Sequence, residues 1–194
     1  MSTPVVEMDD WDDASLVGRS TSGDDAAFAV LVRRYQAPLF RHALRMTSDR
    51  GCAQDVVQEA FLTAWRRLPT LTRPESFRSW LYQITTRRSI DLFRSRHPEQ
   101  PVDTTEGELA SLASTDAGPE ASAEHRAQVG DLAAALETLP LGQRAAWTLR
   151  EIDGLSYEEV AEVLGVPVST VRGRIARARG ALVERMGAWQ TTRG

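Results

Sequence analysis

Apolar residues recur along most of this chain at intervals of three and four, which is the spacing of a helix with one buried side. In the segment 55–68, DVVQEAFLTAWRRL, this spacing predicts a core side made of Val57, Ala60, Phe61 and Ala64. In the segment 75–96 it predicts a core side made of Phe77, Trp80, Leu81 and Ile84. The strict alternation of apolar and polar residues that is typical of strands is absent, so the sequence predicts an all-α protein.

The last third of the chain predicts a helix-turn-helix. The expected helices are 131–139, 143–152, 156–165 and 168–186. The third opens with Ser156, followed three residues later by Glu159, and this pair is the signature of a capping box. The tight turn Gly165-Val166-Pro167 separates the third helix from the fourth. Two helices joined by a short turn that contains glycine have the helix-turn-helix layout.

The last helix has distinct sides when its residues are spaced about 100° apart. A narrow buried seam is expected from Val171, Ile175, Ala178 and Leu182. The opposite side carries only small residues, namely Ser169, Gly173, Ala176 and Gly180. Arginines flank this small side, with Arg172 and Arg179 along one edge and Arg174 and Arg177 along the other.

Small residues would let this helix approach base edges in the major groove of DNA, while the arginines reach phosphates or guanine. Ser169 and Thr170 add free N–H groups at the helix N-terminus, where a phosphate can bind. Each exposed glycine costs a helix roughly 1 kcal/mol relative to alanine, so exposure to solvent alone gives no reason for the two glycines. The alternative is a solvated helix whose arginines stabilise its C-terminal end.

Charged residues are segregated along the chain. The formal net charge is −4, and all 23 basic residues are arginine, so the position of an arginine says more than its identity. Residues 26–95 hold twelve arginines and five acids, whereas residues 96–125 hold seven acids and one arginine. Two arginine-bearing modules are thus joined by an acidic linker, a layout that is compatible with nucleic-acid binding. The linker is either a passive tether or an acidic mimic of nucleic acid inside a basic channel of a partner.

Two further helix sides are candidates for binding. The outer side of 55–68 carries Asp55, Gln58, Glu59 and Leu62. A leucine beside two acids indicates either a protein-binding surface or a solvated side with one stray leucine. The outer side of 75–96 is expected to carry Ser79, Tyr82, Gln83, Thr86 and Arg87, with Arg78 and Arg88 nearby. This mixture suits unstacked bases and phosphates, and it is equally compatible with core aromatics beside a basic exposed side.

Several function classes are disfavoured by what the sequence lacks. Three scattered histidines and the single Cys52 provide no metal-ligand spacing and no nucleophile–base set, so neither a metal, a cofactor nor an enzyme is expected. Cys52 is expected to be a small buried residue. No apolar run is long enough to span a bilayer, and the acidic N-terminus does not resemble a signal peptide, so we expect a cytoplasmic protein.

Four blocks together resemble one family, the extracytoplasmic-function (ECF) group of bacterial RNA polymerase sigma factors. They are GDDAAFAVLVRRY (23–35), AQDVVQEAFLTAWRRL (53–68), FRSWLYQITTRRSIDLFR (77–94) and LPLGQRAAWTLREIDGLSYEEVAEVLGVPVSTVRGRIARARGAL (139–182). The resemblance implies two small helical domains joined by a flexible linker. The implied organisation is an acidic N-terminal arm (1–22), a region 2 domain (23–95), an acidic linker (96–125), a region 4 domain (126–187) and a C-terminal tail (188–194).

The resemblance also implies partners and sites. Core polymerase would be bound through both of its large subunits. The clamp helices of the largest subunit would be contacted by Asp55, Gln58, Glu59 and Leu62. The melted −10 strand of promoter DNA would be bound at Arg78, Ser79, Trp80, Tyr82, Gln83, Thr86, Arg87 and Arg88. The −35 duplex would be read by Ser169, Thr170, Arg172, Gly173, Arg174, Ala176 and Arg177. An anti-sigma factor is a further implied partner, and the family's linker path favours mimicry for the acidic linker.

One departure and one alternative accompany this resemblance. Arg87 stands where the family very often has asparagine, which makes the −10 preference less transferable. The alternative is a free-standing helix-turn-helix regulator that binds duplex DNA without polymerase. Such a regulator does not need an N-terminal module of this form.

Overall fold

Helices form all of the regular secondary structure in residues 8–96 and 132–192, the parts of the chain that this computed structural model describes, with side chains to residue 185. The prediction of an all-α protein is confirmed. The linker predicted at 96–125 lies outside the described residues apart from Arg96, so the choice between tether and mimic stays a prediction.

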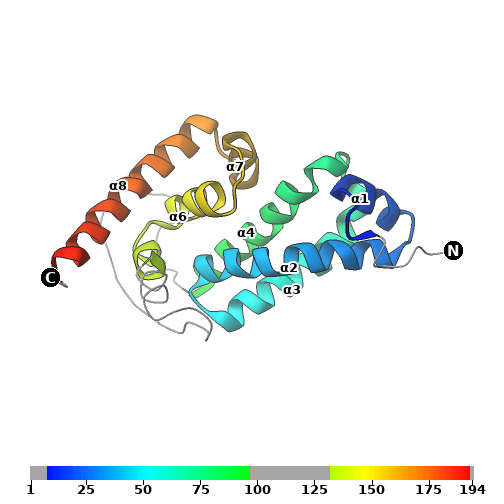
Figure 1. Cartoon of the computed structure of the whole chain (residues 1–194), viewed down its shortest axis with the longest axis horizontal. Helices are drawn as coiled ribbons and strands as arrows, with labels where there is room; N and C mark the ends of the chain where they lie inside the picture. Colours follow the sequence, from blue (N-terminus) through cyan, green and yellow to red (C-terminus); the bar gives the residue numbers. More distant parts are fainter. Residues whose placement is uncertain (1–7, 97–131, 193–194) are drawn as a thin grey trace.

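Three long helices build the N-terminal module (Figure 1). They are α2 (Asp25–Thr47), α3 (Arg50–Arg67) and α4 (Phe77–Arg96), and each packs against the other two. Two short 3₁₀ turns, η2 (Leu68–Thr70) and η3 (Pro74–Ser76), carry the chain from α3 to α4. The core sides predicted from periodicity are largely confirmed, because Ala60, Ala64, Phe77 and Leu81 are buried.

Local chemistry sets where these helices begin. Asp24 and Asp49 are the N-caps of α2 and α3, and their carboxylates accept hydrogen bonds from the backbone N–H groups of Ala26 and Cys52 at 3.1 and 2.7 Å. The backbone hydrogen bond from Cys52 lowers the pKa of Asp49 below its usual range. An ionised carboxylate therefore caps α3 at neutral pH. Its negative charge lies at the positive end of the helix dipole, which also stabilises the helix.

The acidic arm expected at 1–22 is not a separate arm over its described part. Residues Asp13–Thr21 form helix α1, which buries Leu16 and Val17 in the same core as α2. Two acids of this segment bind arginines of α2, with Asp9 pairing to Arg33 at 2.6 Å and Asp13 pairing to Arg34. Two acids of the described part thus serve as ion-pair partners of a basic helix.

The C-terminal module contains the predicted helix-turn-helix. Its elements are a helical segment at 132–137, α6 (Leu141–Trp147), a π-helical turn η4 (Thr148–Ile152), α7 (Tyr157–Leu164) and α8 (Val168–Thr192). The capping box is confirmed, because Ser156 Oγ accepts from the Glu159 N–H at 3.1 Å and Glu159 Oε2 accepts from the Ser156 N–H at 2.7 Å. Gly165 ends α7 with φ of 66°, a left-handed conformation that glycine adopts without strain. Helix α8 continues to Thr192, so the tail expected from residue 188 is helical at its start.

The two modules pack directly against each other, with α7 against α4 and α6 near the end of α2 (Figure 1). One apolar cluster runs through both modules and includes Leu31, Phe77 and Leu81 from the first and Leu149, Val160 and Ile175 from the second. A second cluster joins Met46 of α2 to Leu141 and Ala145 of α6. We call this the closed arrangement, and the sequence patterns did not predict it.

Candidate nucleic-acid and polymerase interfaces

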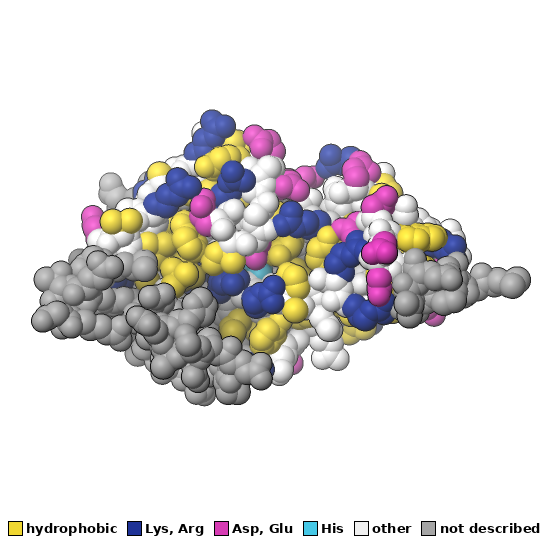
Figure 2. All heavy atoms as spheres, in the orientation of Figure 1, with side chains coloured by type: hydrophobic (Ala, Val, Ile, Leu, Met, Phe, Trp, Pro, Cys, Tyr) yellow, Lys and Arg dark blue, Asp and Glu magenta, His cyan; other side chains and the backbone are white. Residues whose placement is uncertain are grey.

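The outer side of α8 matches its sequence prediction closely. Val171, Ile175, Ala178 and Leu182 form the buried seam. Ser169, Ala176 and Gly180 are exposed on the opposite side, and a side-chain carbon added at Gly180 would meet nothing within 4 Å. Arg172 and Arg177 are exposed on its two flanks. The helix therefore presents a side of small residues between two cations, and Figure 2 shows arginine side chains gathered over the upper left of the molecule, where α7 and α8 lie.

Arg174 does not belong to this outer side, which corrects the prediction that it contacts DNA. It is only 8% exposed, and its Cζ would lie 3.2 Å from a side-chain carbon added at Gly142 of α6. The helix geometry explains this position, because Arg174 is about 60° from Val171 at the edge of the buried seam. Arg174 therefore packs between α8 and α6, and the glycine at 142 makes room for its guanidinium.

Three other arginines on or near α8 contact specific side chains. Arg179 donates to Glu151 Oε1 at 2.8 Å. The Cζ atoms of Arg172 and Arg150 lie 5.4 and 4.6 Å from the centroid of the Tyr157 ring. Sequence reasoning missed Tyr157, although its place at the start of the first helix of the motif could have drawn attention to it.

The outer side of α3 combines acids with exposed apolar side chains. Asp55, Gln58 and Glu59 are exposed, and Leu62 is 49% exposed, as predicted from their spacing. Trp65 is 40% exposed three residues beyond Leu62, and its ring packs edge-on against Phe28 at 4.8 Å. Of the three large hydrophobic side chains that are exposed among the described residues, two are thus on this helix. An acidic surface with an apolar centre fits a protein partner.

Helix α4 departs from the prediction that its polar side is exposed. Ser79, Tyr82 and Thr86 are 5%, 3% and 0% exposed. Only Arg87 and Arg88 are exposed among the predicted −10 residues, and Arg88 is paired with Glu59 of α3 at 2.6 Å. The reason is that α4 is covered on both sides, by α2 and α3 on one and by α7 on the other.

A buried polar network lies where α2, α4 and the C-terminal module meet. His42 Nδ1 is 2.6 Å from Asp153 Oδ2, and its Nε2 is 2.9 Å from Thr86 Oγ1. The side chains of His42 and Asp153 are 0% and 5% exposed. Arg45 lies 3.9 Å from the same carboxylate, and burial lowers the pKa of its guanidinium. The carboxylate of Asp153 therefore provides a hydrogen-bond partner for His42 and a nearby negative charge for Arg45, both in the N-terminal module.

The C-terminal module also binds two of the predicted −10 residues directly. Arg78 donates to the backbone oxygen of Asp153, and Gln83 Nε2 donates to the backbone oxygen of Glu162 at 3.0 Å. In the closed arrangement these side chains are therefore occupied by protein groups.

A buried arginine of the C-terminal module, Arg144, also contacts the N-terminal module. Arg144 is 3% exposed and donates to backbone oxygens of Met46 and Glu137 at 3.3 and 2.6 Å. Burial lowers its pKa to about 10, and the charge of Glu137 opposes this shift. Its Nε and the Oγ1 of Thr148 are buried without a hydrogen-bond partner. Such groups carry a desolvation cost that the surrounding packing must offset.

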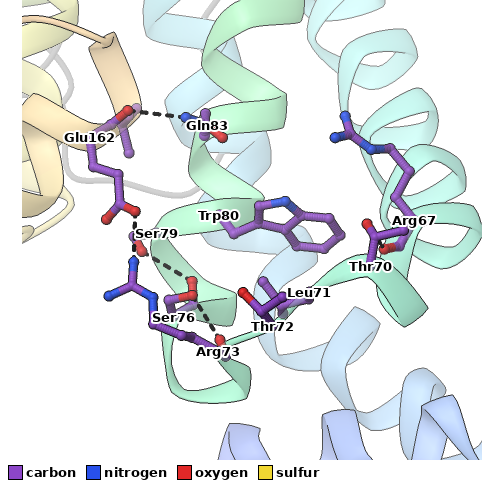
Figure 3. A pocket seen from close by; sticks show the side chains of 11 residues that line it. Arg67, Thr70, Leu71, Thr72, Arg73, Ser76, Ser79, Trp80, Gln83 and Glu162 are labelled. Atoms are coloured by element: carbon purple, nitrogen blue, oxygen red, sulfur yellow. Dashed lines mark hydrogen bonds and ion pairs between the residues drawn. The ribbon is translucent and has the colours of Figure 1, made fainter.

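A pocket of about 210 Å³ lies beside Trp80 (Figure 3). Figure 3 shows the indole ring with Leu71 and Thr72 near it, Arg67 beyond it, and Arg73 at the rim. Arg73 pairs with Glu162 of α7 at 2.8 Å, so a carboxylate from the C-terminal module borders the pocket. The full lining is Arg67, Thr70, Leu71, Thr72, Arg73, Ser76, Ser79, Trp80, Gln83, Glu162 and Val163. Its size is below that of drug-sized ligand pockets.

Comparison with known families assigns both modules. The family described as Sigma-70 region 2 matches residues 31–98, and the family described as Sigma-70, region 4 matches residues 130–182. The chain is 39% identical over 178 residues to the ECF RNA polymerase sigma-E factor of Escherichia coli, a match that covers 88% of this chain and 92% of that protein. The chain belongs to the ECF sigma factors. The RNA polymerase sigma-H factor of Pseudomonas aeruginosa is a further relative, with 38% identity over 177 residues, covering 88% of this chain and 91% of that protein.

Solved structures share the arrangement of this sigma factor over most of its length. CnrH, solved in complex with the cytosolic domain of CnrY, matches with a TM-score of 0.70 and 30% identity, covering 91% of this chain and 97% of that chain. The sigma factor RpoE of Bartonella quintana, solved with the anti-sigma factor NepR, matches with a TM-score of 0.67 and 25% identity, covering 82% and 96%.

The function of an RNA polymerase sigma factor follows from this family membership and confirms the prediction from the four sequence blocks. The presence of both the region 2 and the region 4 families decides against the free-standing helix-turn-helix regulator. Among the helices described, none is both long enough and apolar enough to cross a membrane.

Proposed function

We propose that this sigma factor brings core RNA polymerase to promoters by using three separate surfaces. Helix α8 reads the −35 duplex, the pocket beside Trp80 with the adjoining part of α4 holds the melted −10 strand, and the outer side of α3 binds the polymerase. The observation that carries this proposal is the outer side of α8, where small exposed residues lie between Arg172 and Arg177.

The fit of α8 to duplex DNA is supported by the absence of large side chains on its outer side and by the arginines beside it. Ser169 and Ala176 are exposed and short, so the helix backbone can approach base edges. A side-chain carbon added at Gly173 would lie in ordinary contact with Arg177 Nη1, at 3.5 Å, so the guanidinium of Arg177 lies over this glycine. Arg172 and Arg177 can then reach phosphates or guanine on either side, with Ser169 and Thr170 at the helix N-terminus.

For the −10 strand, the pocket beside Trp80 supplies both elements of single-strand recognition. An indole ring provides a surface on which a base can stack, and Arg67 and Arg73 at its borders can pair with backbone phosphates. Arg78 and Gln83 donate to backbone oxygens of the C-terminal module, so they become available to DNA only after that module has moved off α4. We therefore propose that −10 binding requires opening of the closed arrangement, which binding to the polymerase would drive.

The remaining partners are proposed from the relatives. Because the Bartonella quintana relative was solved with an anti-sigma factor, we propose that an anti-sigma factor also binds this chain. The protein acts by binding, contributes no chemistry of its own, and works in the cytoplasm together with the polymerase.

Replacement of Arg172 by alanine should weaken discrimination at one base pair of the −35 element by about 1–3 kcal/mol, because a bidentate contact to guanine is lost. The measurement is the affinity of polymerase holoenzyme for a set of duplexes that carry single base-pair changes. Arg179→Ala is the matched control, because Arg179 lies on the same helix and is paired with Glu151. A uniform loss across all duplexes would instead make Arg172 a phosphate contact.

The function as a whole is tested by run-off transcription. Core polymerase with this sigma factor is expected to initiate at discrete positions on genomic fragments, and core polymerase alone is not. Tight, sequence-specific binding of duplex DNA by the isolated chain, with no effect on initiation, would contradict the proposal.

A further inference from the structure

Tyr157 connects the helix-turn-helix to two arginines. The Cζ of Arg172, on α8, lies 5.4 Å from the centroid of the tyrosine ring, and the Cζ of Arg150, on the π-helical turn, lies 4.6 Å from it. Both distances are inside the range of about 6 Å over which a guanidinium is attracted to an aromatic ring. One ring thus contacts both the turn that precedes the helix-turn-helix and the second helix of that motif.

The ring is well placed to act as a fixed support. Tyr157 is half-buried and packs against the main apolar cluster, which α7 and α8 share through Val160 and Val171. The preceding residue, Ser156, caps α7 and is itself held by Glu159. On the other side, Arg150 Nη1 donates to the backbone oxygen of Leu155 at 2.7 Å. The ring therefore sits at the ordered start of a helix, with Arg150 anchored next to it.

Arg172 differs from Arg150 in being exposed on the outer side of its helix. A free arginine side chain has many rotamers, and a bidentate contact to a base requires one of them. An attraction between the guanidinium and a fixed ring restricts this choice before DNA arrives, and such preorganisation strengthens binding at the contact concerned.

We propose that Tyr157 is a positioning residue for promoter reading, whose ring orients the guanidinium of Arg172 toward one base pair of the −35 element. This inference rests on the proposed function of α8. It assigns to Tyr157 an influence on sequence preference that acts through Arg172. The ring, and not the hydroxyl, carries this effect.

The test uses holoenzyme and a duplex library in which the −35 element is randomised, with selection for bound sequences followed by affinities for single base-pair variants. Arg172→Ala identifies the base pair that Arg172 reads. Tyr157→Leu is expected to lower discrimination at that same base pair by about 2–5-fold, the range of one exposed cation–π contact, and to leave the other positions unchanged. Tyr157→Phe is expected to match the unaltered protein. In the double variant, Tyr157→Leu should cause no further loss once Arg172 is alanine.

Several outcomes overturn the inference. They are unchanged discrimination in Tyr157→Leu, a uniform loss at all positions, and an equal loss in Tyr157→Phe, which would point to a hydroxyl–phosphate contact. Improved discrimination in Tyr157→Leu would mean that the ring holds Arg172 away from DNA. If Arg172→Ala itself has no effect at any position, the proposed reading by Arg172 fails and the inference falls with it. A thermal unfolding curve of Tyr157→Leu separates these results from a loss of folding.

Discussion

Asp153→Ala should separate the two modules of this sigma factor without unfolding either one. The Asp153 carboxylate lies 2.6 Å from His42 Nδ1 and 3.9 Å from an Arg45 nitrogen, and the side chains of Asp153 and His42 are buried. Removing the carboxylate leaves a buried ring nitrogen of His42 without its hydrogen-bond partner and the charge of Arg45 without its nearby acid, at a cost of about 1–3 kcal/mol or more. Asp153 belongs to the C-terminal module and both of its partners belong to the N-terminal module, so the cost falls on the contact between the modules.

Small-angle X-ray scattering measures this separation as an increase in the radius of gyration of the free protein. Asp153→Asn keeps the size of the side chain and one oxygen acceptor, and should give a smaller increase. Asp91→Ala is the matched control, because Asp91 is an exposed acid on α4. If the scattering of Asp153→Ala equals that of the unaltered protein, the apolar contacts alone hold the modules together, and the polar network contributes nothing to closure.

Reversing the charges of Asp55 and Glu59 to arginine should strongly reduce binding to core polymerase. Both acids are exposed on α3 beside Leu62 and Trp65. Truncating one partner of a desolvated charge pair at an interface costs about 2–5 kcal/mol, which corresponds to a roughly 30-fold or greater loss of affinity. A competition assay against a fluorescently labelled, unaltered sigma factor measures it.

The control for this double variant must account for the ion pair between Glu59 and Arg88, which joins α3 to α4 at 2.6 Å. Arg88→Ala breaks the same pair without placing a positive charge on α3, and should leave most of the affinity. Asp91→Arg adds the same kind of charge elsewhere on the module. Equal binding by the double variant and the controls would move the polymerase-binding surface away from this side of α3.

Periodicity predicted individual helices well because a buried seam is a local property. Val171, Ile175, Ala178 and Leu182 are buried as their spacing requires. The burial of Arg174 could not be predicted from periodicity. A helical wheel places it about 60° from the seam, and whether such a residue is buried depends on the neighbouring helix. Here Gly142 of α6 leaves the space that the guanidinium fills.

Helix α4 was harder to predict for a related reason. Phe77 and Leu81 indicated one buried side, and the polar residues opposite were expected to be exposed. Ser79, Tyr82 and Thr86 are buried because helices from both modules cover α4. Thr86 is buried against His42, from which it is separated by 44 positions in the sequence, and His42 contacts Asp153, from which it is separated by 111 positions. Local spacing carries no information about contacts of this range.

The position of Cys52 gives the protein a built-in reporter of internal motion. It is the only cysteine in the chain, it is 5% exposed in the first turn of α3, and burial raises its pKa. Reagents attack the thiolate of an accessible cysteine, so the rate of thiol modification at fixed pH measures how often the packing around α3 loosens. In Asp153→Ala, modification as slow as in the unaltered protein, together with an increased radius of gyration, would identify rigid-body separation of two intact modules.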